Sequence, residues 1–253
     1  MKRILAFLLA GMMAVSLAAC GESDNQENSQ PSSASSLSQS SEPEQAPSSE
    51  QSQPTSSATE ETPEESGNST NMLVAYFSYA ENADLPDGVD ASATASIQTW
   101  NNTLTGNTGV IANMIAESTG AELFSIQTVE KYPASYDETV DQGQQERNAD
   151  VRPELTTLPE NLDAYDVIFL GFPNWWGDMP MAMYSFLEQV DLSGKTIVPF
   201  VTSGGSGFSS TISTIEDMES GATVQEGLSL RDSSAAGAQQ QVNEWLSGLG
   251  YAG

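Results

Sequence analysis

A run of small polar residues has the composition of a phosphate-binding turn. The run is Thr105, Gly106, Asn107 and Thr108, and it opens a segment, Gly109 to Glu117, whose apolar residues recur with helical spacing. Hydroxyls and backbone N–H groups at a helix N-terminus bind phosphate, and the helix dipole adds to the attraction. Ser78, at the end of an apolar run, is a further hydroxyl for this site. An ordinary turn and helix cap is the alternative for the four residues by themselves.

The phosphate would be held without a nearby cation in the sequence. No Lys or Arg occurs between Asn71 and Glu130, so neutral donors would carry the binding.

A second loop, residues 171–180, contains two adjacent tryptophans between glycine and proline residues. The residues of interest are Pro173, Asn174, Trp175, Trp176 and Gly177. Two exposed indoles are unfavourable in water, and a flat heteroaromatic ring is a natural partner for one of them. Packing into the core or into a protein interface is the alternative. Because the loop follows the carboxyl end of an apolar strand, its position favours a ligand.

A third loop is rich in glycine and follows another apolar strand. It comprises Ser203, Gly204, Gly205, Ser206 and Gly207. Glycines let the backbone approach a ligand closely, and the amides and hydroxyls can pair with the polar edge of a heteroaromatic ring. Each loop is weak evidence alone, but three such loops at strand ends together indicate a nucleotide-like ligand.

The composition excludes several kinds of chemistry. The chain has no histidine and a single cysteine, Cys20, which rules out Ser-His-Asp triads, imidazole bases, disulfides and the usual zinc sites. Any reaction must use carboxylates, hydroxyls or a bound cofactor. The formal net charge of -28 argues against nucleic acid as a partner.

Short apolar runs alternate with helix-like segments after residue 71. We expect strands over 73–77, 122–127, 166–171, 196–202 and 223–228, and helices over 109–117, 136–148, 181–188, 209–218 and 234–249. This alternation predicts an α/β fold with a doubly wound, five-stranded parallel sheet and helices on both faces. Ligands bind such sheets at the carboxyl ends of the strands.

The segment from Leu73 to Leu249 resembles the flavodoxin family, in its variants with an enlarged loop after the first strand. The motifs that carry the resemblance are Tyr76-Phe77-Ser78, Glu81-Asn82, Gly106-Asn107-Thr108, Arg152-Pro153-Glu154, Tyr165 to Gly171, Pro173, Trp175-Trp176-Gly177, Ser193 to Thr196 and Gly204 to Gly207.

The resemblance implies FMN as the cofactor. It implies that Ser78 and Thr105 to Thr108 hold the phosphate, and that Pro173 to Gly177 and Ser203 to Gly207 flank the isoalloxazine ring. Because the chain has no histidine and no cysteine after Cys20, we expect no catalytic side chain and no metal ligand, and the bound flavin would be the reacting group. The chain departs from shorter flavodoxins by an insertion, Tyr79 to Leu104, for which we expect a lid or a partner-docking loop.

The N-terminus has the features of a bacterial lipoprotein signal. A basic start precedes the apolar run Ile4 to Ala19, which ends in Leu17-Ala18-Ala19-Cys20. A transmembrane helix is the alternative, but the run is shorter than the roughly 20 residues a span needs. We expect a signal peptide over 1–19, lipidation of Cys20, a disordered tether over 20–70 rich in Ser, Glu, Gln and Pro, and an FMN-binding domain over 71–253.

These observations lead to a functional expectation. The chain would be anchored by lipid to the outer face of the cytoplasmic membrane, where it would bind FMN and exchange electrons with redox partner proteins. Two alternatives are an NAD(P)H- or quinol-dependent FMN reductase and a flavin-free binding module on the same fold. NAD(P)H is scarce outside the cytoplasm, which favours the electron carrier.

Overall fold

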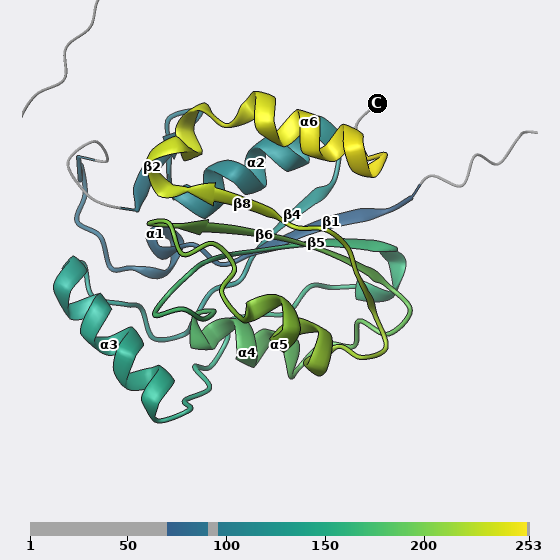
Figure 1. Cartoon of the computed structure of the whole chain (residues 1–253). Helices are drawn as coiled ribbons and strands as arrows, with labels where there is room; N and C mark the ends of the chain where they lie inside the picture. Colours follow the sequence, from purple (N-terminus) through teal and green to yellow (C-terminus); the bar gives the residue numbers. More distant parts are fainter. Residues whose placement is uncertain (1–69, 91–95, 252–253) are drawn as a thin grey trace, which may run out of the picture. The chain divides into compact units, whose positions relative to one another are not determined.

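A parallel β-sheet forms the centre of the folded region. The computed structural model describes residues 70–90 and 96–251. The strands are β1 (Met72–Tyr76), β4 (Glu122–Ser125), β5 (Val167–Pro173), β6 (Thr196–Ser203), β7 (Thr223–Val224) and β8 (Leu228–Arg231). They lie in the order β4-β1-β5-β6, with β7 and β8 both pairing with the outer side of β6, and every pairing is parallel (Figure 1). The expected α/β fold class is confirmed.

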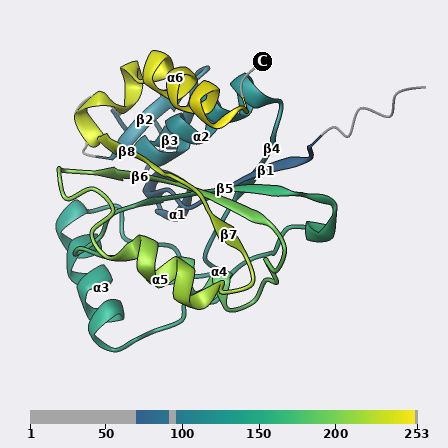
Figure 2. The same ribbon diagram turned by 45° about the vertical axis from the view of Figure 1, so that its right-hand side comes forward.

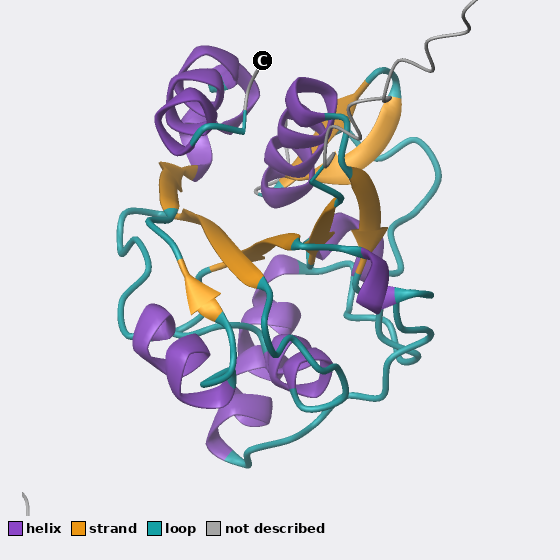
Figure 3. Cartoon of the chain, turned by 90° about the vertical axis from the view of Figure 1, so that its right-hand side faces the viewer, coloured by secondary structure: helices purple, strands orange, loops and turns teal. Residues whose placement is uncertain are grey.

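Helices cover both faces of the sheet. They are α2 (Asn107–Thr119), α3 (Tyr136–Asn148), α4 (Met181–Leu187), α5 (Thr211–Met218) and α6 (Gln239–Leu249). Figure 3 shows the strands between two layers of helices, and in Figure 1 α2 and α6 lie on one side while α3, α4 and α5 lie on the other. Alternate side chains of β1 enter the two hydrophobic cores. Leu73 and Ala75 pack into one core, as does Phe77 just after the strand, and Val74 and Tyr76 pack into the other.

The last strand differs from the expectation, because it is divided into β7 and β8. Gln225 N–H donates to Ile197 O at 2.9 Å, and the next bond of a parallel ladder would be donated by residue 199. That residue is Pro199, which has no N–H, so the pairing is interrupted before it resumes at Leu228. The predicted strand 223–228 was therefore wrong in its bounds.

Two predicted helices also begin later than expected. The helix predicted from residue 209 starts at Thr211, because Ser209 has a positive φ of 51°. The helix predicted from residue 234 is α6, which starts at Gln239 after a separate 3₁₀ helix, η2 (Asp232–Gly237). Another 3₁₀ turn, η1 (Leu162–Ala164), precedes β5.

The insertion after β1 forms secondary structure of its own. It contains the short helix α1 (Tyr79–Asn82) and an antiparallel hairpin of β2 (Ile97–Trp100) and β3 (Thr103–Gly106), which lies beside α2 in Figure 2. Asn101 and Asn102 both have positive φ, as a two-residue type I′ hairpin turn requires. Since β3 leads directly into α2, Thr105 and Gly106 end a strand instead of forming a free turn.

The expected signal peptide, Cys20 and the tether lie outside the described residues. Within the described part of the chain, no helix has the length and apolar character needed to cross a membrane.

Candidate functional site

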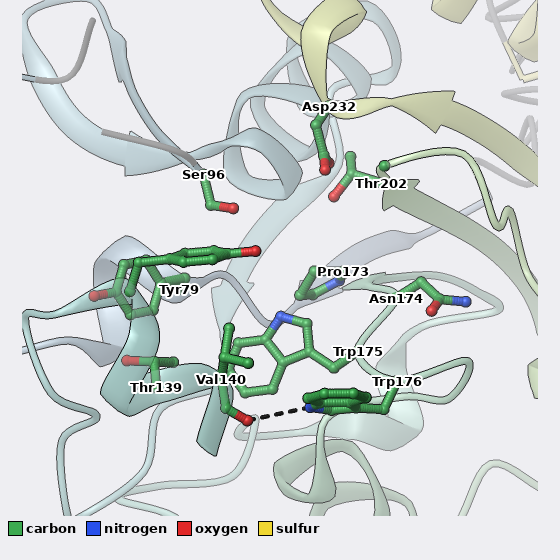
Figure 4. Close-up of a pocket in the computed structure, with 12 residues that line it drawn as sticks. Tyr79, Ser96, Thr139, Val140, Pro173, Asn174, Trp175, Trp176, Thr202 and Asp232 are labelled. Atoms are coloured by element: carbon green, nitrogen blue, oxygen red, sulfur yellow. Dashed lines mark hydrogen bonds between the residues drawn. The ribbon is translucent and has the colours of Figure 1, made fainter. Parts of the chain in front are cut away.

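A cavity lies at the carboxyl ends of the parallel strands. Its volume is about 340 Å³, and its lining comprises Tyr79, Ser96, Tyr136, Thr139, Val140, Pro173, Asn174, Trp175, Trp176, Thr202, Gly204 and Asp232 (Figure 4). Tyr79 follows β1, Pro173 ends β5, Thr202 is near the end of β6 and Asp232 follows β8. The next strand of the sheet after β1, which is β4, lies on one side of β1, and the following strand, β5, lies on the other side. The carboxyl ends of β1 and β5 therefore form the topological switch point, where such folds bind ligands.

The two tryptophans have different environments. Trp175 packs edge-on against Phe77 and Tyr132, with ring centroids 5.5 and 5.3 Å away, while part of its indole lines the cavity. Trp176 is 45% exposed, and its Nε1 donates to Val140 O at 3.2 Å, the dashed contact in Figure 4. Trp175 is therefore part of the core and of the cavity wall, whereas Trp176 presents its ring at the opening.

A tight turn presents Trp176. Trp175 N–H donates to Asp178 O at 2.9 Å and Asp178 N–H donates back to Trp175 O at 3.0 Å. The two central residues, Trp176 and Gly177, have φ of 58° and 78°, which makes this a type I′ turn. A positive φ is unfavourable for tryptophan, so the turn holds its ring at the cavity in a strained backbone position.

Asn174 joins this turn to the glycine-rich loop. Its Oδ1 accepts from Gly177 N–H at 3.0 Å, and its Nδ2 donates to Gly207 O at 2.8 Å and to Ser209 Oγ at 3.0 Å. One amide side chain therefore sets the spacing of the two loops that follow β5 and β6.

The glycine-rich loop contributes less to the cavity than the sequence predicts. Gly204 lines it, but Ser203, Gly205, Ser206 and Gly207 do not, and Gly177 of the other loop also lies outside the lining. Ser203 Oγ accepts from Gly205 N–H at 3.2 Å and from Gly207 N–H at 3.0 Å. The loop's own turn therefore uses two of the N–H groups expected to face a ligand.

The predicted phosphate residues meet at the N-terminus of α2. Ser78 is 1% exposed, and a Cβ at position 106 would overlap its Oγ, so the fold brings Ser78 against Gly106 despite the long insertion. Among the described residues, two buried side-chain oxygens have no hydrogen-bond partner, Ser78 Oγ and Glu81 Oε2. Gly106, the N-cap of α2, has no side chain to cap the helix.

The other three predicted phosphate residues already have partners. Thr108 Oγ1 shares a hydrogen bond of 2.8 Å with Thr202 Oγ1, and Thr105 Oγ1 bonds to Glu81 Oε1. Asn107 Oδ1 accepts from Gln98 Nε2 at 3.0 Å. Ser78 is thus the predicted hydroxyl that is buried and free for a ligand.

Charged groups surround this end of α2. Burial raises the pKa of the Asp232 carboxyl, an effect that a hydrogen bond with Asn107 opposes. Lys131 Nζ donates to Glu81 O at 2.8 Å, and burial lowers the pKa of this amine while the Glu81 charge raises it. The Nζ contacts of Lys131 are with Glu81 O and Gln127 Oε1, so the expectation that neutral donors hold the phosphate stays a prediction.

These groups fit the FMN that the resemblance implies. An unpaired buried hydroxyl beside an uncapped helix N-terminus suits a phosphate. Position 106 has no room for a side chain, so the backbone there stays close to Ser78. A cavity walled by Tyr79, Trp175 and Trp176 suits a flat ring system.

Several lining residues were not predicted. Thr202 and Asp232 lie at the carboxyl ends of strands. Because ligands bind parallel sheets at these ends, their position in the sequence could have identified them as lining residues. Tyr136, Thr139 and Val140 share one face of α3 at spacings of three and four residues, and nothing in that pattern indicates a ligand. In the described residues, no cluster of three or more Asp, Glu, Cys or His could hold a metal ion.

Comparison with known proteins supports the assignment of fold. A flavoprotein from Bacteroides eggerthii DSM 20697 is 25% identical with a TM-score of 0.55, and the match covers 72% of this chain and 98% of that one. A flavoprotein from Bacteroides uniformis ATCC 8492 is 27% identical with a TM-score of 0.53, covering 70% and 98%. The comparison with curated proteins found no match.

A family model described as Flavodoxin matches residues 100–249, which is more than half of the 253 residues. The matched range includes α2 and the loops after β5 and β6, while β1 and Ser78 precede it. Together with the parallel sheet and the cavity at its carboxyl edge, this match shows that the chain belongs to the flavodoxin family.

Proposed function

We propose that this protein binds FMN and transfers electrons between redox partner proteins while anchored by lipid to the outer face of the bacterial cytoplasmic membrane. The observation that carries the proposal is the buried, unpaired Ser78 Oγ at the uncapped N-terminus of α2, close to an aromatic cavity at the same sheet edge. Cys20 and the signal-like residues 1–19 supply the anchor.

Each part of the site has a separate task. Ser78 Oγ and the first N–H groups of α2 bind the phosphate. Trp176 covers one face of the ring and shields it from water, while Trp175 supports the cavity wall from the core. When bound, FMN supplies one- and two-electron transfer, which the side chains of this protein cannot perform.

Electron transfer is favoured over turnover of a diffusible substrate by the charge of the domain. Residues 71–253 contain 25 acidic and 5 basic side chains, a formal charge of 5 minus 25, or -20. Such a surface attracts basic proteins and repels anionic molecules such as NAD(P)H.

The absorption spectrum of the full chain, purified in mild detergent, tests FMN binding. We expect the visible bands of an oxidised flavin, either as purified or after FMN is added, and we expect heat to release FMN. A colourless protein that takes up no FMN would instead be the flavin-free binding module.

Mixing the flavin-loaded protein with NAD(P)H or a quinol under anaerobic conditions separates carrier from reductase. We expect NAD(P)H to reduce the flavin too slowly for catalysis. Rapid multiple turnover with either reductant would contradict the proposal of an electron carrier and support the alternative, an FMN reductase.

A further inference from the structure

The Glu81 carboxylate lies beside the proposed phosphate site. Its Oε1 bonds to Thr105 Oγ1 and, more weakly at 3.4 Å, accepts from Tyr76 Oη. A Cβ at Gly109, in the first turn of α2, would be 2.7 Å from this Oε1. The other oxygen, Oε2, is buried without a partner, as is Ser78 Oγ. The two buried oxygens without a hydrogen-bond partner, Ser78 Oγ and Glu81 Oε2, therefore belong to residues that both contact the start of α2.

No cation in the described part of the chain pairs with this carboxylate. The three ion pairs formed there involve Arg147 and Arg152, on the side of α3. Lys131 is the nearest cation, but its Nζ donates to the main-chain oxygen of Glu81 and to Gln127 Oε1, at 2.8 and 3.1 Å.

The other ionisable groups at this end of α2 do not neutralise Glu81 either. Tyr76 stays protonated because burial, followed by the charge of Glu81, raises its pKa. Asp232, which faces Asn107, is a second acid, and the first turn of α2 has none. Lys131 interacts with the Glu81 charge, whereas Arg231, next to Asp232, donates to Gly204 O at 3.4 Å.

A phosphate dianion placed at this helix start would meet a carboxylate in partly buried surroundings. Like charges that share a buried site are strongly disfavoured, and such pairs normally retain one proton. A retained proton would also give Glu81 Oε2 the hydrogen-bond partner that it lacks, because a buried oxygen left unpaired is unfavourable.

We propose that FMN binds to this protein together with one proton, which is held between Glu81 Oε2 and an oxygen of the phosphate group. This inference rests on the proposed FMN site. The proton comes from solvent and forms one O–H bond, with no other bond made or broken, and Ser78 and the α2 N–H groups bind the remaining phosphate oxygens. Glu81 is thus a residue that makes the site select the protonated phosphate ester.

The pH dependence follows from proton uptake. The second pKa of a phosphate monoester is about 6, so above that pH free FMN is a dianion and must gain a proton to bind. The FMN affinity then falls about tenfold for each pH unit above neutrality, because one proton is taken up. Riboflavin, which lacks the phosphate, shows no such change.

The experiment measures dissociation constants of FMN and riboflavin for the flavin-depleted full chain between pH 6.5 and 8.5. For the wild type we expect FMN binding to weaken on the order of 100-fold over this range, with riboflavin unchanged. In Glu81→Gln the amide can donate to the dianion, so we expect the FMN affinity to vary less than about threefold. Glu130→Gln, which removes an exposed carboxylate next to Lys131, should keep the wild-type slope.

Calorimetry of the wild type in buffers of different ionisation enthalpy provides a test that needs no variant. Uptake of about one proton per FMN at pH 8 supports the inference. FMN binding without proton uptake, a slope that persists in Glu81→Gln, or equal effects of that substitution on both flavins would overturn it. Failure of the wild type to bind FMN at every pH would overturn the proposed function itself.

Discussion

Ser78 is the residue on which we expect phosphate recognition to depend. Replacing it with alanine removes a buried hydroxyl that has no partner within the described protein. A hydrogen bond to a charged oxygen contributes about 1.5 to 3 kcal/mol, so Ser78→Ala should weaken FMN at least tenfold and leave riboflavin nearly unchanged. Flavin fluorescence titrations measure both constants. Ser213→Ala, which removes an exposed hydroxyl of α5 that donates to Ser210 O, is the control, and equal losses for FMN and riboflavin in Ser78→Ala would contradict the assignment.

Trp176 combines a ring at the cavity with an unfavourable backbone conformation. Asparagine tolerates positive φ better, so Trp176→Asn should leave thermal stability equal or raise it by up to about 1 kcal/mol. The lost indole face should weaken FMN and riboflavin alike, by about two- to tenfold. Thermal denaturation and flavin titration together measure the two effects. Unchanged binding of both flavins would show that the ring does not cover the cofactor.

At the scale of elements, the junction of β1, β3 and α2 decides whether the phosphate site exists. A methyl group at Gly106 would overlap Ser78 Oγ, whereas one at Gly248, in α6, would meet no atom within 4 Å. We expect Gly106→Ala to lose at least tenfold in FMN affinity, and Gly248→Ala to bind normally and to gain up to about 1 kcal/mol of stability. Titration and denaturation of both variants check this, and normal FMN binding by Gly106→Ala would mean that the phosphate lies elsewhere.

Helix α3 closes the other side of the cavity through few contacts. Besides the Trp176 bond to Val140, Arg147 pairs with Asp178 at 3.5 Å, and a Cβ at Gly143 would lie 3.2 Å from the Trp175 ring. The glycine lets helix and indole approach closely. Since exposed ion pairs contribute little, the packing on Trp175 and the 2.9 Å hydrogen bond from Tyr132 Oη to Glu146 Oε2 hold α3 at the cavity.

At the scale of the whole molecule, the proposed lipid anchor depends on a single atom, the sulfur of Cys20. Cys20→Ala should prevent lipidation, so the protein should be retained only through an uncleaved signal peptide or be lost to the medium. Cell fractionation with mass spectrometry of the N-terminus measures this, with the wild type expected in the membrane fraction. A wild-type protein that begins at a residue other than 20 and lacks lipid would contradict the anchor.

The acidic charge of the domain gives a prediction for the proposed redox behaviour. A formal charge of -20 opposes the placing of negative charge in the ring site, although salt screens all but the nearest groups. In a reductive titration of the FMN-loaded protein we expect two resolved one-electron steps, the second at lower potential. A single two-electron step would argue against the carrier.

Local sequence was sufficient to predict most of the elements. The bounds of α3 agree with the prediction. Ser135 is the N-cap of this helix, and its Oγ accepts from Glu138 N–H at 3.5 Å, a signal contained in four consecutive residues. The apolar runs that became β1, β5 and β6 were equally clear, because strands buried on both faces are almost wholly apolar. The division of β7 from β8 was missed because it depends on Pro199 of a neighbouring strand.

The sequence by itself determined the α/β class, the family resemblance and the three loops from which the site is built. Only the tertiary structure decided which side-chain atoms beside those loops have no hydrogen-bond partner. It pairs Thr108 with Thr202 and Thr105 with Glu81, and it leaves Ser78 Oγ and Glu81 Oε2 without partners. The physical reason is that a hydroxyl's availability depends on neighbours distant in sequence, such as residues 108 and 202, which local spacing does not encode.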